Sequence, residues 1–142
     1  MRISDVLKGK GDSSVATIRP DDDVSALLAL LASRGIGAVV VSDDGATIAG
    51  IVSERDIVRR LADRPDSLHA AVRDIMTVEV ITCTPETTVE ELSGEMTQRR
   101  IRHIPVVRGG QMIGLVSIGD VVKHRIGQLQ AEAEHLAGYL HQ

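Results

Sequence analysis

The chain has almost no aromatic residues: its 142 residues include one Tyr and neither Phe nor Trp. The core must therefore be built from aliphatic side chains and Met. Stacking of bases on aromatic rings, the usual way to hold single-stranded nucleic acid, is excluded beyond Tyr139. A net charge of −4 also gives no electrostatic support for binding a nucleic-acid backbone. We therefore expect no nucleic-acid partner.

Cysteines and long apolar runs are scarce as well. Cys83 is the only cysteine, which excludes an internal disulfide and a Cys-rich metal site. Its apolar-flanked position predicts a buried, inert thiol rather than a nucleophile. The five His residues show no tight ligand spacing, so we expect no metal. No run of 18 apolar residues and no signal-peptide pattern occur, which predicts a cytoplasmic protein with no membrane partner.

What the chain does contain is one short string in two copies. Gly114 to Asp120 reads G-L-V-S-I-G-D, and Gly50 to Asp56 reads G-I-V-S-E-R-D. In each copy two apolar residues end a predicted strand, and Ser begins a helix with Asp three residues later. A Ser at this position caps the helix, and the backbone amides after it form an anion site.

The sequence around the two strings repeats in register. Pro20 matches Pro85 at a shift of 65, and the same shift relates Leu27 to Leu92. The second hairpin, at Arg108-Gly109-Gly110, is one residue shorter, so the shift becomes 64 from Gly114 onward. A match maintained through several elements indicates a tandem repeat.

Each repeat is predicted to be a β-α-β-β-α unit, which gives an α+β fold with the two units related by a pseudo-twofold axis. We expect repeat 1 in residues 1–66, repeat 2 in 67–125 and a C-terminal amphipathic helix in 126–142. Short helical turns at Ile3 to Leu7 and Val72 to Met76 precede the repeats, and Lys8 to Ser14 is a loop. The expected strands are Val15 to Ile18, Ile36 to Val41, Ile48 to Val52, Val80 to Cys83 and Ile104 to Val107, and the expected helices begin at Val24, Ser53, Val89 and Ser117.

The C-terminal segment has apolar residues at heptad-like spacing. Ile126, Leu129, Ala133, Leu136 and Leu140 follow one another at intervals of 3 and 4. The two repeats already close a core, so a helix of a partner chain is the natural cover for this seam. We expect a homodimer contact here.

With both repeats in view, the chain resembles a cystathionine-β-synthase domain pair, the Bateman module, over residues 3 to 125. Gly114-x-x-Ser117-x-x-Asp120 and its copy match the nucleotide motif of that family, with Ser in place of the more frequent Thr. Ile101 to Val107 matches its second strand, including the usual Pro105. The opening Asp5-Val6-Leu7, Lys10-Gly11, Val15-x-Thr17 and Pro20 look like stand-alone bacterial members.

The resemblance implies a regulatory sensor without catalytic residues. Modules of this family pair into a disc-shaped dimer and bind AMP, ADP, ATP, S-adenosylmethionine or nicotinamide dinucleotides; we favour AMP, ADP, ATP or NAD(H). The motif Asp is expected to bind the ribose hydroxyls and the motif Ser the phosphate, with adenine between apolar strand residues. The expected nucleotide-binding residues are Lys10, Ser14, Val15, Ala16, Ile36, Gly37, Ala38, Ser53, Arg55, Asp56, Val80, Arg102, His103, Ile104, Pro105, Ser117, Ile118, Gly119 and Asp120.

The residues themselves support this chemistry but leave alternatives. The carboxylate of Asp120 can accept from both ribose hydroxyls, and Arg102 and His103 can reach the same phosphate as Ser117. The alternative is a capped helix with an acid in its first turn and no ligand. Gly37-Ala38 leaves room for an adenine ring opposite Asp120, which favours this site over the Asp56 site, or it serves tight packing alone.

Three functions remain open at this stage. The first is an adenine-nucleotide sensor acting on an unidentified regulated protein. The second is a structural dimerisation module whose clefts stay empty. The third, a small hydrolase or transferase, has no nucleophile or metal constellation in the sequence to support it, so we expect no enzyme. Lys10 is either a phosphate ligand in a flexible loop or merely solvated.

Overall fold

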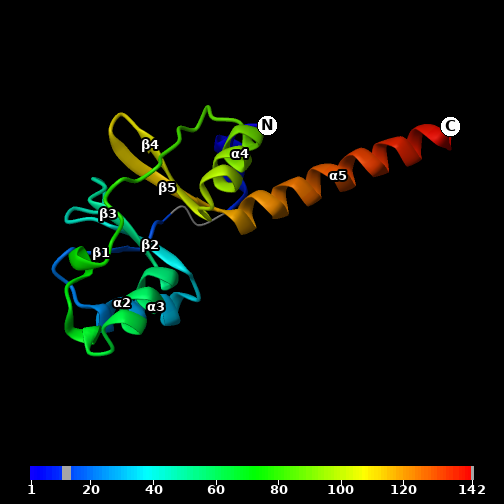
Figure 1. Cartoon of the computed structure of the whole chain (residues 1–142). Helices are drawn as coiled ribbons and strands as arrows, with labels where there is room; N and C mark the ends of the chain where they lie inside the picture. The colour runs from blue at the N-terminus through cyan, green and yellow to red at the C-terminus, as the bar shows by residue number, and fades with distance from the viewer. Residues whose placement is uncertain (11–13, 142) are drawn as a thin grey trace.

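The structure, a computed structural model, describes residues 1–10 and 14–141. It has the predicted mixed α+β fold (Figure 1). Gly11 to Ser13 of the predicted loop and Gln142 at the end of the predicted C-terminal helix lie outside the described residues. The elements of the first half are α1 (Ile3–Gly9), β1 (Thr17–Ile18), α2 (Val24–Arg34), β2 (Ala38–Val41), β3 (Gly50–Ser53) and α3 (Glu54–Asp63).

The second half repeats this order with fewer strands. Two short 3-10 turns, η1 (Ser67–His69) and η2 (Val72–Asp74), lead into it. It then contains α4 (Val89–Arg99), β4 (His103–Arg108), β5 (Gln111–Ser117) and α5 (Ile118–Leu140). The predicted helix starts are confirmed: Asp23, Ser53, Thr88 and Ser117 are N-caps whose side chains accept a backbone N–H.

The two sheets are small. In the first, β1 pairs with β2 in parallel and β2 with β3 antiparallel, and the second is the antiparallel pair β4 and β5. The predicted strand Val80 to Cys83 is wrong: only Cys83 forms a bridge, to Val106. The segment just before Val80 pairs with the first half instead: Thr77 exchanges two backbone hydrogen bonds with Ile51 of β3, at 2.8 and 2.9 Å.

The two halves exchange their leading segments. Ile3 N donates to the Thr87 carbonyl at 2.8 Å, and Val72 N donates to the Asp22 carbonyl, also at 2.8 Å. The fully buried Ile3 therefore belongs to the core of the second half, around Leu92, while Val72 belongs to the core of the first half. Each core is thus completed by the segment that precedes the other repeat, an exchange that was not predicted from the sequence.

The C-terminal helix is continuous with the helix that the second string begins. α5 runs over 23 residues and projects away from the rest of the molecule (Figure 1). Along it Val122, Ile126, Leu129, Leu136 and Leu140 are exposed. In the described part of the chain, no helix is long and apolar enough to cross a membrane.

Candidate functional site

The start of α5 forms a capping box. Ser117 Oγ accepts from Asp120 N at 3.1 Å, and Asp120 Oδ2 accepts from Ser117 N at 2.9 Å. The start of α3 has the same arrangement, with Ser53 N donating to Asp56 Oδ2 at 2.8 Å. The capped helix start that we considered as an alternative is therefore formed at both strings. It holds each carboxylate in one orientation beside the first helical turn.

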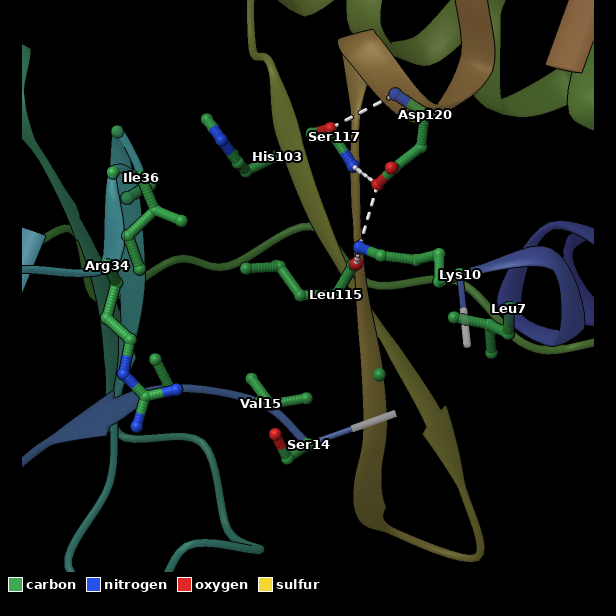
Figure 2. A pocket seen from close by; sticks show the side chains of 15 residues that line it. Leu7, Lys10, Ser14, Val15, Arg34, Ile36, His103, Leu115, Ser117 and Asp120 are labelled. Carbon is green, nitrogen blue, oxygen red and sulfur yellow. Dashed lines mark hydrogen bonds and ion pairs between the residues drawn. The ribbon is translucent and has the colours of Figure 1, made fainter. Parts of the chain in front are cut away.

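Lys10 connects the start of α5 to the segment that follows α1. Its ammonium lies 2.8 Å from Asp120 Oδ2 and donates to the Leu115 carbonyl, also at 2.8 Å. Figure 2 shows it reaching toward both oxygens from the side of α1. Burial acts to raise the pKa of Asp120, but the hydrogen bonds from Lys10 and Ser117 outweigh it, so the pKa lies below its usual value. Asp120 is therefore a carboxylate, held ready to accept hydrogen bonds.

A cavity of about 470 Å³ lies against this carboxylate (Figure 2). We call it the Asp120 cleft. Apolar and backbone surfaces from both halves form its walls, with Lys10 and Asp120 on one side and Arg34 on the other (Figure 2). It is lined by Leu7, Lys10, Ser14, Val15, Ala16, Arg34, Gly35, Ile36, Gly37, Ala38, His103, Gly114, Leu115, Ser117 and Asp120.

Ten of the expected residues line this cleft together: Lys10, Ser14, Val15, Ala16, Ile36, Gly37, Ala38, His103, Ser117 and Asp120. Others do not. Ile104 and Pro105 are buried in the second half, and Ile118 borders a groove between α4 and α5. Gly119 is exposed without lining this cleft, and Arg102 lines the other cleft described below. A matched motif identifies a segment, but not which of its side chains point into the cavity.

Five residues of the cleft were not expected: Leu7, Arg34, Gly35, Gly114 and Leu115. Arg34 and Gly35 end α2 directly before the expected Ile36, with Gly35 at a left-handed φ of 61°. Arg34 matches Arg99 at the repeat shift of 65, and the usable signal was that Arg34 and Gly35 directly precede the expected Ile36. Leu7 had no such signal, because it reaches the cleft only through the exchange of leading segments.

A second cavity, of about 520 Å³, lies at the first string, and we call it the Asp56 cleft. It contains the expected Ser53, Arg55, Asp56, Val80 and Arg102. The other residues that line it are Gly37, Ala38, Ile51, Glu54, Arg59, Thr77, Glu79, Ile81, Arg99, Arg100, Ile101 and His103. The two clefts are therefore built from largely equivalent positions of the two repeats.

His103 borders both clefts. Burial lowers its pKa, helped by Lys10 and Arg102, while the nearby carboxylates of Asp120 and Glu54 act in the opposite direction. The imidazole is thus neutral near pH 7 and offers one hydrogen-bond donor and one acceptor rather than a positive charge. The cations of the Asp120 cleft are Lys10 and Arg34.

Chemistry outside the clefts is limited. Cys83 is buried, and burial raises the pKa of its thiol to about 11, as suits the predicted inert thiol. Among the described residues, no group of three or more His, Cys, Asp or Glu side chains is placed to hold a metal ion.

Comparisons with known proteins address this architecture directly. A family model of the CBS domain matches residues 3–63 and 72–127. The mitochondrial CBS domain-containing protein CBSX3 of Arabidopsis thaliana is 41% identical over 146 residues, which cover 97% of this chain and 71% of that protein. A CBS-domain containing protein from Agrobacterium tumefaciens has a TM-score of 0.84 at 38% identity, covering 88% of this chain and 99% of that one.

One solved relative carries a ligand. A CBS domain protein from Pyrobaculum aerophilum, complexed with AMP, has a TM-score of 0.74 at 28% identity. The match covers 84% of this chain and 89% of that one. The matched segments take in both strings and both clefts, and the chain belongs to the CBS-domain family.

Proposed function

We propose that this protein is a non-catalytic sensor that binds an adenosine nucleotide in the Asp120 cleft. The observation that carries the proposal is the meeting of an oriented carboxylate, two cations and an apolar slot in one cavity of about 470 Å³. This size lies within the range of small-molecule sites. AMP, ADP, ATP and NAD(H) share the adenosine group that such a cavity suits.

Each part of the nucleotide has a counterpart in the cleft. Val15, Ala16 and Ile36 offer apolar surface for the base. Gly37 adds no side chain to the slot, and a Cβ there would lie 3.4 Å from Glu54 Oε1 and 3.9 Å from His103 Cε1. Asp120 is a two-oxygen acceptor for the ribose diol. In the described residues its contacts all use Oδ2, which leaves Oδ1 for a ligand.

Lys10 is the ligand for the phosphate in this proposal. Without ligand, Lys10 forms an ion pair with Asp120. When the ribose hydroxyls donate to the Asp120 carboxylate, the Lys10 ammonium can instead bind a neighbouring phosphate. Ser117 and the first amides of α5 add an anion site at the helix start. The AMP complex of the Pyrobaculum aerophilum relative supports the same ligand class.

The signal in this proposal is a change of dimer geometry. The exposed apolar residues of α5 are the surface that pairs with a second copy, and the regulated partner is an unidentified protein. A ligand acts on this equilibrium only if it binds one geometry more tightly than the other. The ligand contacts the first turn of α5, so its binding energy depends directly on how that helix is placed.

Calorimetry and thermal shift on the full chain test the proposal, with AMP, ADP, ATP, NADH and S-adenosylmethionine. Ligand at a hundredfold excess over Kd stabilises the folded state by about 2.7 kcal/mol. Asp120→Asn should weaken binding by about tenfold to a hundredfold, since it removes a charged acceptor. The matched control, Asp56→Asn, changes the same position of the other capping box and should leave AMP affinity within about twofold.

A structural dimerisation module remains the second candidate, because the exposed seam of α5 suits pairing without any ligand. It predicts that none of the five ligands shifts the melting transition at millimolar concentration, while sedimentation still shows a dimer. That pair of results would overturn the sensor proposal.

A further inference from the structure

We propose that the Asp56 cleft is a second binding site, which takes a linear polyphosphate chain. Five arginines line this one cavity: Arg55, Arg59, Arg99, Arg100 and Arg102. The whole chain has 16 Lys and Arg residues and a net charge of −4, so positive charge is concentrated here. This site shares only Gly37, Ala38 and His103 with the Asp120 cleft, and it stands whether or not that cleft holds a nucleotide.

The arginines stand where the other cleft has glycines. At the repeat shift of 65, Arg100 matches Gly35 and Arg102 matches Gly37. At the shift of 64 that holds after the hairpin, Gly119 matches Arg55. Two positions that line the Asp120 cleft therefore carry no side chain, and a third, Gly119, lies next to the lining residue Asp120; the equivalent positions of the Asp56 cleft carry guanidinium groups. The two clefts are built for ligands of different shape and charge.

Arg100 holds its position against the preference of its backbone. With a φ of 56° it is the one non-glycine residue with positive φ in the described part of the chain. Its counterpart Gly35 has a φ of 61° in the same place, after the last turn of the preceding helix. A left-handed conformation favours Gly, and a side chain there is destabilising. Strain of this kind is typical of positions that bind ligands.

Part of the lining of the Asp56 cleft is fixed by backbone pairing. Thr77 and Ile51 exchange two backbone hydrogen bonds there, whereas the equivalent Leu115 carbonyl of the other cleft accepts only the flexible Lys10 side chain in the described residues. Three carboxylates, those of Glu54, Asp56 and Glu79, also line the Asp56 cleft and are outnumbered by the arginines. The lining of the Asp56 cleft therefore carries more positive than negative side chains.

Polyphosphate is the chemistry that fits such a cleft. A guanidinium group donates paired hydrogen bonds to phosphate oxygens, and it stays charged at every physiological pH. The arginines come from α3, from the end of α4 and from the segment before β4, so they can contact successive phosphates rather than one. The N-terminus of α3, capped by Ser53, faces the same cavity and adds a partial positive charge.

Calorimetry of the full chain with inorganic tripolyphosphate tests this site. We expect one tripolyphosphate per chain, with affinity about tenfold weaker in Arg100→Gly and at least a hundredfold weaker in the double variant Arg100→Gly and Arg102→Gly. Arg100→Gly also relieves the left-handed strain, so its melting temperature should rise. Loss of binding together with a gain of stability separates a ligand contact from a folding defect.

Two controls separate this site from general electrostatics and from the Asp120 cleft. Arg125→Gln removes one exposed arginine from α5 and should change tripolyphosphate affinity less than twofold. Asp120→Asn should leave it unchanged while it weakens AMP. ATP titrated into Asp120→Asn distinguishes two possible natural ligands of the Asp56 cleft. Tighter binding than tripolyphosphate indicates a nucleoside triphosphate, and equal or weaker binding indicates an inorganic chain.

The proposal is overturned by either of two results. One is the absence of tripolyphosphate binding at millimolar concentration. The other is an equal loss of affinity in Arg100→Gly and Arg125→Gln, which would assign the binding to net charge alone.

Discussion

The Asp120 and Asp56 clefts begin from the same local structure and end as different sites. Each has a Ser-Asp capping box at the start of a helix. Lys10 pairs with Asp120 in one, while five arginines, Glu54 and Glu79 line the other together with Asp56. Because the motif residues are the same, they cannot account for the difference. The residues around the motif decide which ligand each cleft suits.

The length of one connection explains much of this difference. The leading segments match at a shift of 69, from Ile3 to Val72, whereas the strands and helices after them match at 65. The first connection is therefore four residues longer than the second. Lys10, in the longer one, donates to the Leu115 carbonyl. In the shorter one, Thr77 exchanges two backbone hydrogen bonds with Ile51.

The largest expected effect tests whether the two halves are separate at all. Leu27 and Leu92 are matched, fully buried residues of the two cores. Leu→Ala at either position should lower the free energy of unfolding by about 3 kcal/mol, because it leaves a cavity. Since the leading segments are exchanged, both variants should shift one shared transition in urea, followed by circular dichroism. Two separate transitions would show that the halves fold independently.

The next prediction concerns a substitution that makes the Asp120 cleft resemble the Asp56 cleft. Gly37→Arg adds, at a residue that lines both clefts, the side chain that Arg102 gives the Asp56 cleft. It should weaken AMP at least tenfold, about 1.4 kcal/mol, by filling the slot proposed for the base. Calorimetry measures the loss, and Gly94→Arg is the control, since a Cβ at Gly94 meets nothing within 4 Å. Undiminished AMP binding in Gly37→Arg would show that the base does not bind in this slot.

The smallest expected effect concerns His103, which both clefts share. Its pKa is lowered by burial, reinforced by Lys10 and Arg102 and opposed by Asp120 and Glu54. The unfolded chain therefore takes up a proton near the ordinary value of 6.5, and the folded chain does so only at lower pH. The contribution of neutral His103 to the free energy of unfolding is therefore complete above pH 6.5 and declines as the pH falls below that value.

Urea midpoints between about pH 7.5 and about pH 5.5 measure this decline. His103→Gln should flatten the profile over that range. The control His141→Gln, at the exposed end of the chain, should retain the slope of the parent protein. Equal slopes in His103→Gln and the parent would assign the pH dependence to other groups.

The repeat made most of the fold predictable. Helix starts followed from capping residues and apolar spacing, as at Asp23 and Ser117, because these are local properties of the chain. Strand ends were less predictable: Val15 to Ile18 was expected, and the structure pairs only Thr17 and Ile18. A strand is defined by its partner, and sequence spacing contains no information on where pairing stops.

The cleft was predictable in its segments and less so in its side chains. Ser117, Asp120 and Gly37 were expected from the motif and its repeat, and the structure brings them to one cavity. Ile104 was expected in the site but lies fully buried in a core, because its strand presents His103 to the cavity and Ile104 to the interior. Leu7 could not be found without knowing that the leading segments cross between the halves.

The helix that begins at the Asp120 cleft is also the one that extends furthest from it. Its 23 residues make a rod about 34 Å long, whose first turn borders the cavity and whose far end is exposed in the part of the chain that the structure describes. A tilt of about 5° at the first turn displaces the far end by about 3 Å. In the proposed signalling, α5 acts as a lever: a displacement of its first turn that is too small to change the packing of the cleft is enlarged at the far end, where another molecule can contact it.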